Sequence, residues 1–446
     1  MQFYARIEPG VLLQTMKLKL ICHLLPLVMA LSGASFAAVP SKVSIVQDAA
    51  GRFILMRDDK SVHINGAGGT RHLKDLVKFG GNSIRTWGID SLEEKIDGKP
   101  LLDYCHELGI SVTVGIWVEH ERHGFDYSDQ AAVEGQRKIV RDAVIKYRGH
   151  PALLMWGLGN EMEGPQSDGR DVRIWKELNL LAGIIKKEDP NHPVMTVIAG
   201  AAESKVKGII EYCPNIDVLG VNAYSGASGA VRTAKQAGWK KPFVLTEFGP
   251  QGHWEVSKTA WDAPIEPSSR EKAGSYYATL SLLADSPDIC LGSYVFLWGQ
   301  KQEVTSTWYG MFLASGEKLP TVDAVCRAWT GKWPENRSPK ITTFDTPLRD
   351  ASVTPGQIVP AGVVTEDAES DSLQWEWFVV EESADRRVGG DLETAPPAVA
   401  DAIMSHERGK AMIKAPSKPG AYRLFIVVRD GKGGASADNI PFQVKN

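Results

Sequence analysis

The chain has 446 residues, of which 43% are hydrophobic and 23% charged, a composition typical of a soluble globular protein. This length exceeds what one small hydrophobic core needs and predicts two domains. The formal net charge of −4 gives no indication of binding to nucleic acids or anionic membranes, so we expect neither partner. Thirteen tryptophans suit a sugar-binding cleft, although they fill cores equally well.

The N-terminal segment has the features of a secretory signal. A positively charged start leads into an apolar run over residues 18–31, and a small-x-Ala cleavage site ends at Ala37. We therefore expect a signal peptide over residues 1–37, with Met16 as an alternative start of translation, and a secreted or periplasmic mature protein. The run is short for a membrane span, and we expect no span elsewhere.

Short apolar runs alternate with longer amphipathic segments from about residue 50 to residue 331. The runs that we expect to be buried parallel strands are Val62–Gly66, Ser83–Trp87, Ile110–Trp117, Ala152–Leu158, Pro193–Ile198, Ile216–Val221, Phe243–Leu245 and Leu291–Leu297. Between them lie helical stripes of apolar residues, for example over 133–147 and 174–185. Eight such strand–helix units predict a (β/α)8 TIM barrel over residues 38–333.

A change of pattern marks a second domain. Residues 334–340 form a polar linker with proline, and beyond it apolar and polar residues alternate in short segments. The clearest expected strands are 373–380, 420–428 and 440–444. This pattern predicts an Ig-like β-sandwich over residues 341–446. Trp375 and Trp377 share one strand face, which indicates either a core stripe or a carbohydrate-binding surface.

Two glutamates stand at the ends of expected strands. Glu161 closes the run Trp156-Gly-Leu-Gly-Asn-Glu161 after the fourth strand, and Glu247 lies in Val244-Leu-Thr-Glu-Phe-Gly249 at the end of the seventh. A barrel brings these ends to one rim. Two carboxylates that flank one bond are the groups that cleave a glycosidic linkage with retention of configuration. We therefore expect Glu161 to be the acid/base, with a raised pKa, and Glu247 to be the ionised nucleophile.

These motifs resemble glycoside hydrolase clan A, whose members carry an Asn-Glu pair after the fourth barrel strand and a glutamate after the seventh. Asn160-Glu161 and Glu247 match that pattern, and the run Gly80-Gly-Asn-Ser-Ile-Arg-Thr-Trp-Gly88 is similar to the second strand of the family 2 barrel. Unlike family 2, the chain is expected to have no sandwich domains before its barrel. A barrel followed by an Ig-like domain resembles the layout of glycoside hydrolase family 158, which acts on β-1,3-glucan.

The resemblance to clan A implies roles for further residues at the strand ends. Asn160 would bond the sugar 2-hydroxyl, and Arg85 would pair with the nucleophile. Asn222 and Tyr224 follow the sixth strand, and the tyrosine hydroxyl would orient the same carboxylate. Trp298 would form the platform beneath the reacting sugar. The alternatives are a rim salt bridge for Arg85 and simple packing for Tyr224 and Trp298.

The loop over residues 117–123, after the third strand, carries several polar and aromatic groups. We expect Trp117 and Trp87 to line the cleft, and Glu119 and His123 to contact neighbouring sugar units. The loop lacks the HExxH spacing and the cysteines contain no CxxC pair, so we expect no metal site. Further cleft candidates by position are His253, Trp254 and Trp308.

The sequence thus predicts a secreted retaining β-glycoside hydrolase that acts on polysaccharide or oligosaccharide without a cofactor, with an endo-acting β-1,3-glucanase as the favoured activity. The alternatives on the same scaffold are a β-mannanase, a β-galactosidase and a glucan transglycosylase. A non-catalytic carbohydrate-binding protein is a more distant alternative, because both glutamates are present. The sequence defines no oligomeric state.

Overall fold

The computed structural model describes residues 39–164, 166–387 and 389–446. The expected signal peptide lies outside the described residues. No helix within the described ranges is both long and apolar enough to cross a bilayer. The cysteines at 105, 213, 290 and 326 are free and buried.

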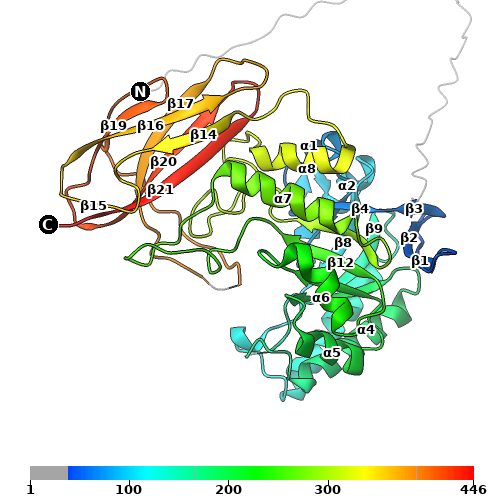
Figure 1. Cartoon of the computed structure of the whole chain (residues 1–446). Helices are drawn as coiled ribbons and strands as arrows, with labels where there is room; N and C mark the ends of the chain where they lie inside the picture. Colours follow the sequence, from blue (N-terminus) through cyan, green and yellow to red (C-terminus); the bar gives the residue numbers. More distant parts are fainter. Residues whose placement is uncertain (1–38, 165, 388) are drawn as a thin grey trace, which may run out of the picture. The chain divides into compact units, whose positions relative to one another are not determined.

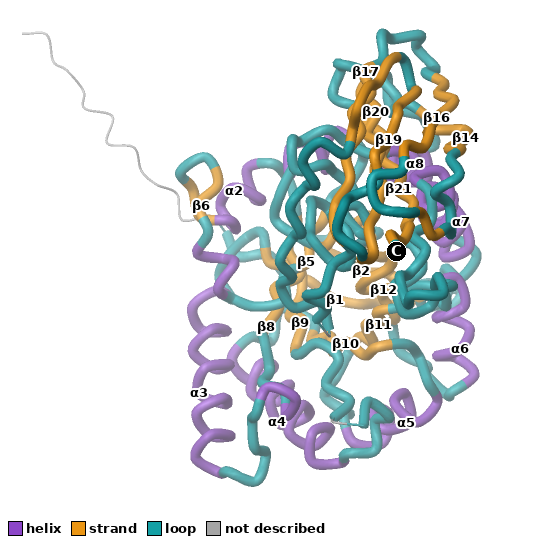
Figure 2. The backbone as a smooth tube through the Cα atoms, turned by 90° about the vertical axis from the view of Figure 1, so that its left-hand side faces the viewer, coloured by secondary structure: helices purple, strands orange, loops and turns teal. Residues whose placement is uncertain are grey.

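Eight parallel strands close into a barrel, which confirms the predicted (β/α)8 TIM barrel (Figures 1 and 2). In chain order they are β4 (Ile64–Gly68), β5 (Ser83–Arg85), β8 (Ser111–Ile116), β9 (Leu153–Leu158), β10 (Val194–Ala199), β11 (Val218–Asn222), β12 (Phe243–Phe248) and β13 (Cys290–Val295). Nearly all of their residues are buried, because one face fills the barrel and the other meets helices. Each predicted run overlaps one of these strands, with ends displaced by a few residues at most.

Helices cover the outside of the barrel (Figure 2). They are α1 (Leu73–Lys78), α2 (Leu101–Glu107), α3 (Gln130–Tyr147), α4 (Val172–Glu188), α5 (Glu203–Tyr212), α6 (Ala230–Gln236), α7 (Ser269–Leu283) and α8 (Pro320–Thr330). In α4 the predicted stripe over 174–185 is buried, and the Asp171 side chain caps the first turn by accepting from the Arg173 N–H at 3.0 Å. The loops add η1 (Asp90–Glu93), β6 (Lys95–Ile96), β7 (Lys99–Pro100), η2 (Glu121–His123) and η3 (Ala227–Gly229).

A small antiparallel sheet that the sequence reading missed covers the amino ends of the barrel strands. It consists of β1 (Val43–Gln47), β2 (Phe53–Arg57) and β3 (Lys60–Val62). The buried side chains of Val43 and Leu55 pack in one apolar cluster with residues of the barrel interior such as Met195. The sheet therefore closes the end of the barrel that is opposite the glutamates.

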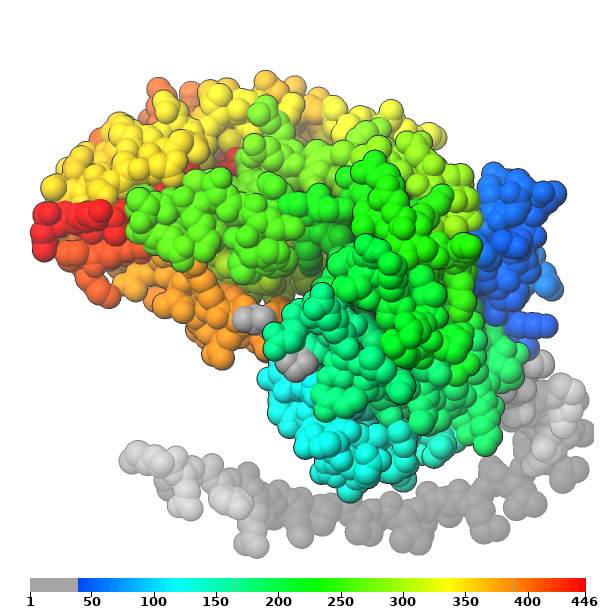
Figure 3. Space-filling view, turned by 60° about the horizontal axis from the view of Figure 1, so that its bottom comes forward, coloured from blue at the N-terminus to red at the C-terminus, as the bar shows by residue number. Residues whose placement is uncertain are grey.

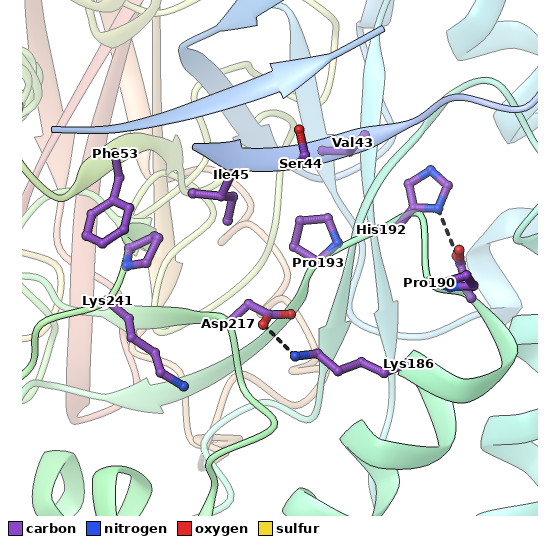
Figure 4. Close-up of a pocket in the computed structure, with 12 residues that line it drawn as sticks. Val43, Ser44, Ile45, Phe53, Lys186, Pro190, His192, Pro193, Asp217 and Lys241 are labelled. Carbon is purple, nitrogen blue, oxygen red and sulfur yellow. Dashed lines mark hydrogen bonds and ion pairs between the residues drawn. The ribbon is translucent and has the colours of Figure 1, made fainter. Parts of the chain in front are cut away.

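Figure 4 shows an open depression of about 570 Å³ between this sheet and the barrel base, lined in part by Phe53, Lys186 and Asp217. At its edge the Ser41 hydroxyl lies 3.0 Å from His192 Nε2, and His192 Nδ1 lies 2.8 Å from an Asp189 oxygen. All three side chains are buried, and the Ser41 hydroxyl donates to a backbone carbonyl at 2.8 Å. Ser41, His192 and Asp189 therefore form a buried structural hydrogen-bond network, and the Ser41 hydroxyl is not accessible as a nucleophile.

The C-terminal part is an Ig-like β-sandwich, as predicted. One sheet has the order β14 (Lys340–Asp345), β16 (Ile358–Glu366), β19 (Lys410–Lys414), β18 (Ile403–Glu407). The other has the order β15 (Ser352–Val353), β21 (Ala435–Val444), β20 (Gly420–Arg429), β17 (Gln374–Glu381). Trp377 is buried in the core between the sheets and Trp375 packs against that core, so these two residues form a core stripe and not a carbohydrate-binding face.

Polar contacts join the sandwich to the barrel. The Ser269 N–H at the start of α7 donates to Asp438 Oδ1 at 2.7 Å, and Arg423 Nη2 donates to the Pro264 carbonyl at 2.9 Å. These side chains are buried, so their hydrogen bonds depend on the two domains remaining packed together.

Candidate active site

The two predicted catalytic glutamates lie at the carboxyl ends of the fourth and seventh barrel strands, β9 and β12. Glu247 belongs to β12 and is in register with Asn222 of β11. Glu161 follows β9, where its backbone N–H donates to the Val197 carbonyl at 2.8 Å. Its φ of +55° is left-handed, which costs a non-glycine residue about 1 kcal/mol. This turn holds the Glu161 carboxylate within hydrogen-bonding distance of Asn222.

Three side chains donate hydrogen bonds to the carboxylate of Glu247. Arg85 Nη1 lies 2.8 Å from Oε1, Trp87 Nε1 lies 2.6 Å from the same oxygen, and the Tyr224 hydroxyl lies 3.3 Å from Oε2. The side chains of Arg85 and Glu247 are 2% and 9% exposed, so water screens the ion pair little. Such a charge-assisted hydrogen bond stabilises the negative carboxylate.

Tyr224 remains a neutral phenol in this setting. Burial raises the pKa of Tyr224 well above its usual value, and the negative charge of Glu247 raises it further. The hydroxyl therefore keeps its proton and acts as a donor to the carboxylate.

Glu161 has different surroundings. Burial raises the pKa of Glu161 to about 7, and the negative charge of Glu247 adds to the rise. Asn222 Nδ2 donates to Glu161 Oε1 at 2.8 Å and acts in the opposite direction, because this bond stabilises the carboxylate. A carboxyl group with this pKa carries a proton in a large share of molecules at neutral pH and can donate it to a substrate.

A hydrogen-bond network connects the two glutamates. Asn160 Oδ1 accepts from Arg85 Nη2 at 2.7 Å and from Asn222 Nδ2 at 3.1 Å. Thr246, which the sequence reading did not single out, donates to Asn222 Oδ1 at 2.8 Å. The structure thus brings Arg85, Asn160 and Asn222 together between the two carboxylates.

The loop after β8 places three other predicted residues at the rim of the barrel. The Trp117 ring is partly exposed and lies 4.9 Å from the His120 ring and 6.2 Å from the His123 ring. Glu119 and His123 are exposed. The Glu119 N–H donates to Gln136 Oε1 of α3 at 2.8 Å, which fixes the loop against that helix. These residues lie at the rim and outside the network around the glutamates.

Trp298 is buried away from the site, which corrects its prediction as a sugar platform. Its side chain is fully buried, and its indole N–H donates to the His72 carbonyl at 3.1 Å. The ring packs between Phe312 and Trp329, at centroid distances of 5.2 and 6.2 Å. No face of the indole is therefore available to a sugar.

Phe296, two residues earlier in the chain, takes the place facing the site. Its ring lies edge-on to Trp87 at 5.9 Å and to Tyr224 at 6.2 Å. Leu297 belongs to the same cluster. Residues two apart share a face in a strand, but β13 ends at Val295, so strand alternation does not determine which of Phe296 and Trp298 faces the site.

His120 is a further residue near the site that the sequence reading did not select. It is 7% exposed, its ring is hydrogen bonded to the Asn160 backbone, and its Nε2 has no partner among the described residues. Burial lowers the pKa of His120 to about 4, and the positive charges of Arg122 and His123 add to the effect. The neutral ring therefore offers a ligand one unsatisfied nitrogen.

The three further candidates, His253, Trp254 and Trp308, differ in exposure. Trp254 is 58% exposed and lies edge-on to Tyr224 at 5.6 Å, which puts it at the rim. His253 lies 4.9 Å from the Trp254 ring. Trp308 is fully buried and donates to the Gln251 carbonyl at 2.9 Å, so it belongs to the packing beneath the loop.

One group of acidic side chains among the described residues has metal-ligand spacing. Asp367, Asp371 and Asp430 have oxygens within 4.8 Å of one another, and they belong to turns of the sandwich, not to the barrel rim. Asp430 Oδ1 accepts from the Lys432 and Gly434 N–H groups, and Asp367 Oδ1 accepts from the Asp371 N–H. These contacts belong to turns, and Asp367 Oδ2 is buried without a hydrogen-bond partner among the described residues.

No family model matches the chain. A putative β-glucuronidase of Formosa agariphila is 25% identical over 179 residues, which is 39% of this chain and 15% of that protein. The β-galactosidase BoGH2A of Bacteroides ovatus is 26% identical over 207 residues, 40% of this chain and 23% of that protein. The matches thus span less than a quarter of either relative.

Solved structures with a similar fold include a Bacteroides uniformis β-glucuronidase, with a TM-score of 0.50 at 15% identity. The superposition covers 90% of this chain and 48% of that one. A β-D-glucuronidase of Dictyoglomus thermophilum gives a TM-score of 0.50 at 18% identity, over 66% of this chain and 54% of that one. At this identity the likeness concerns the fold alone.

Proposed function

We propose that the protein is a retaining β-glycoside hydrolase. The observation that carries this proposal is the pair of carboxyl groups at the ends of β9 and β12. They share one hydrogen-bond network, and Glu161 is suited to carry a proton while Glu247 is paired with a buried guanidinium. This division of protonation states is what double displacement at a sugar requires. Similarity to a β-glucuronidase and a β-galactosidase supports the same reaction class.

The proposed reaction has two steps. Glu161 gives its proton to the glycosidic oxygen while Glu247 Oε attacks the anomeric carbon, so the glycosidic C–O bond breaks and a glycosyl ester forms. Glu161, now a carboxylate, takes a proton from water, and the resulting nucleophile attacks the anomeric carbon and releases Glu247. The product keeps the β configuration because the carbon is inverted twice.

The surrounding residues support each step. Arg85, Trp87 and Tyr224 hold the nucleophile in place, and by resemblance to clan A the Asn160 amide would donate to the sugar 2-hydroxyl. That bond strengthens as positive charge develops on the sugar ring.

We propose β-1,3-glucan as the substrate and endo cleavage as the mode of action. The layout of a barrel followed by an Ig-like sandwich supports this choice, through its resemblance to family 158. Two cations near the glutamates are already paired, Arg85 with Glu247 and Lys301 with Glu303 at 2.8 Å each, which favours a neutral sugar over a uronic acid. A β-galactoside or β-glucuronide is the second candidate, because relatives with those activities match the barrel region.

The proposal is tested by incubating the protein with laminarin, mixed-linkage glucan, mannan and galactan, and with aryl β-glucoside, β-galactoside and β-glucuronide. We expect laminarin to be cut to a ladder of oligosaccharides. A single small product would indicate exo action, and longer products would indicate transglycosylation. Cleavage of the galactoside or glucuronide alone would overturn the choice of glucan.

The nucleophile is tested by Glu247→Gln. We expect turnover to fall roughly 10³-fold or more, while affinity for an oligosaccharide changes little, because the amide keeps the shape but cannot attack. Equal turnover in the variant and the wild type would end the assignment. Sugar binding without turnover by the wild type would favour the non-catalytic alternative.

We further propose that the protein is exported, on the basis of its N-terminal sequence. N-terminal sequencing of protein from the culture medium or periplasm should find a start at residue 38. A start at residue 1 or 16 in that fraction would contradict cleavage at Ala37.

A further inference from the structure

The segment between β17 and β18 of the sandwich reaches the catalytic end of the barrel. Lys301 Nζ, in the loop after β13, donates to the Gly390 carbonyl at 2.6 Å. The Val304 N–H donates to Glu393 Oε2 at 2.7 Å. The segment is orange in Figure 3 and lies there beside the loops of the barrel.

The same segment also meets the loop after β8. Asp391 Oδ2 lies 3.9 Å from His123 Nε2. Gly389 has a φ of +68°, and a Cβ atom at this position would collide with the Arg122 guanidinium. Because β4 and β5 lie between β13 and β8 in the barrel, the segment spans the rim above the strand that carries Arg85.

Three aromatic rings, those of His123, Trp117 and His120, lie in contact with one another between this segment and Asn160. The His123 ring is stacked against Trp117 with an interplanar angle of 18°, and Trp117 lies 4.9 Å from His120. His120 is in turn hydrogen bonded to the backbone of Asn160, which adjoins Glu161. Only the His123 ring thus separates the sandwich segment from the Trp117 indole at the rim of the barrel.

From this arrangement we propose that Asp391, His123 and Trp117 form a subsite. It would bind the pyranose unit next to the sugar whose anomeric carbon Glu247 attacks. The side chains of His123 and Asp391 are 36% and 52% exposed, and their separation of 3.9 Å is too long for a hydrogen bond. Both groups therefore keep the capacity to bind vicinal sugar hydroxyls. The indole of Trp117 would pack on the C–H face of the same ring.

This inference rests on the proposed function and narrows it. A subsite built jointly by both domains favours substrates of several sugar units over simple β-monoglycosides. It also assigns the sandwich a direct part in substrate recognition.

The test compares Asp391→Ala with wild type on two substrates: the pentasaccharide of whichever polysaccharide the wild type degrades, and the aryl β-monoglycoside of the same sugar. We expect the ratio of kcat/KM for pentasaccharide to that for monoglycoside to fall about tenfold, mainly through KM, which corresponds to the loss of one hydrogen bond to a charged group. Glu407→Ala, an exposed acid in β18, is the matched control and should leave the ratio unchanged.

An unchanged ratio in Asp391→Ala overturns the subsite and leaves the hydrolase intact. Thermal unfolding of the variant shows whether the segment still packs, and Asp391→Asn, which keeps the size and one acceptor, should recover part of the ratio. Pentasaccharide affinity in the Glu247→Gln background gives an independent readout and should fall by a similar factor. A wild type that neither cuts nor binds any glycan of the panel contradicts the proposed function and the subsite together.

Discussion

Glu161 and Glu247 carry the same functional group, but their side chains have different neighbours. Glu247 receives hydrogen bonds from a buried guanidinium, an indole and a phenol. Glu161 is partly buried beside that negative charge and receives one amide hydrogen bond from Asn222. The environment, and not the side chain, therefore distinguishes the proposed acid from the proposed nucleophile.

Asn222→Ala should move the alkaline limb of the pH profile. Glu161 must be protonated to act as the acid, so kcat/KM of the wild type should fall as the pH rises through about 7, the raised pKa of Glu161. Loss of the Asn222 bond, which stabilises the carboxylate, should raise that pKa and shift the limb to higher pH. Profiles of kcat/KM with an aryl glycoside measure the shift.

A limb that stays in place or moves to lower pH in this variant would contradict the role of Glu161 as the acid. Lys418→Ala, an exposed change in the sandwich, serves as the control and should leave the profile unaltered.

Sequence motifs predicted most of the residues that contact the glutamates, but not every residue around them. Arg85, Asn160 and Asn222 could be found because the resemblance to clan A implies their roles and because they end or follow barrel strands, whose carboxyl ends meet at one rim. Trp298 was misplaced and His120 was not selected. Their positions depend on how the chain turns after a strand has ended, and periodicity carries no information about that turn.

At the scale of elements, the eight barrel strands were predictable because parallel strands buried on both faces are continuous apolar runs. The sheet β1–β3 was not. Among its residues only Val43 and Leu55 are fully buried, and a single buried side chain per strand cannot be distinguished from a loop. The same holds for β18 of the sandwich, whose residues are almost all exposed.

Leu55→Ala should show how much this sheet contributes to stability. Leu55 is fully buried against the barrel base, so its truncation should lower the free energy of unfolding by about 2–5 kcal/mol. Val46→Ala, in the same sheet but 43% exposed, should change it by less than about 0.5 kcal/mol. Urea titrations of both variants provide the comparison, and similar values for the two would show that the sheet is not part of the barrel core.

At the scale of the molecule, barrel and sandwich share buried polar groups. Arg423 of β20 is 2% exposed and forms two hydrogen bonds to Glu382, at 2.7 and 2.9 Å, and one to the Pro264 carbonyl of the barrel. A buried guanidinium of this kind stabilises only the geometry in which all its partners are present. The two domains should therefore unfold together.

Arg423→Met should separate the unfolding of the two domains. The change leaves the buried Glu382 with only the more distant Arg386, at 3.3 Å, as a cation, and this loss should cost up to about 3–5 kcal/mol. Calorimetry should show one transition for the wild type and two for the variant. Lys418→Ala removes an exposed ion pair from the same sandwich and should leave a single transition, and a single transition in Arg423→Met as well would show that Arg423 does not couple the domains.

The left-handed backbone at Glu161 has a consequence for how this position is maintained. Glycine would adopt that conformation without strain. An uncharged residue would also avoid the free-energy cost of placing a carboxylate in a partly buried position. Folding alone would thus select against glutamate at position 161. A glutamate at this position therefore lowers stability, as is expected of a residue that the proposed proton transfer needs.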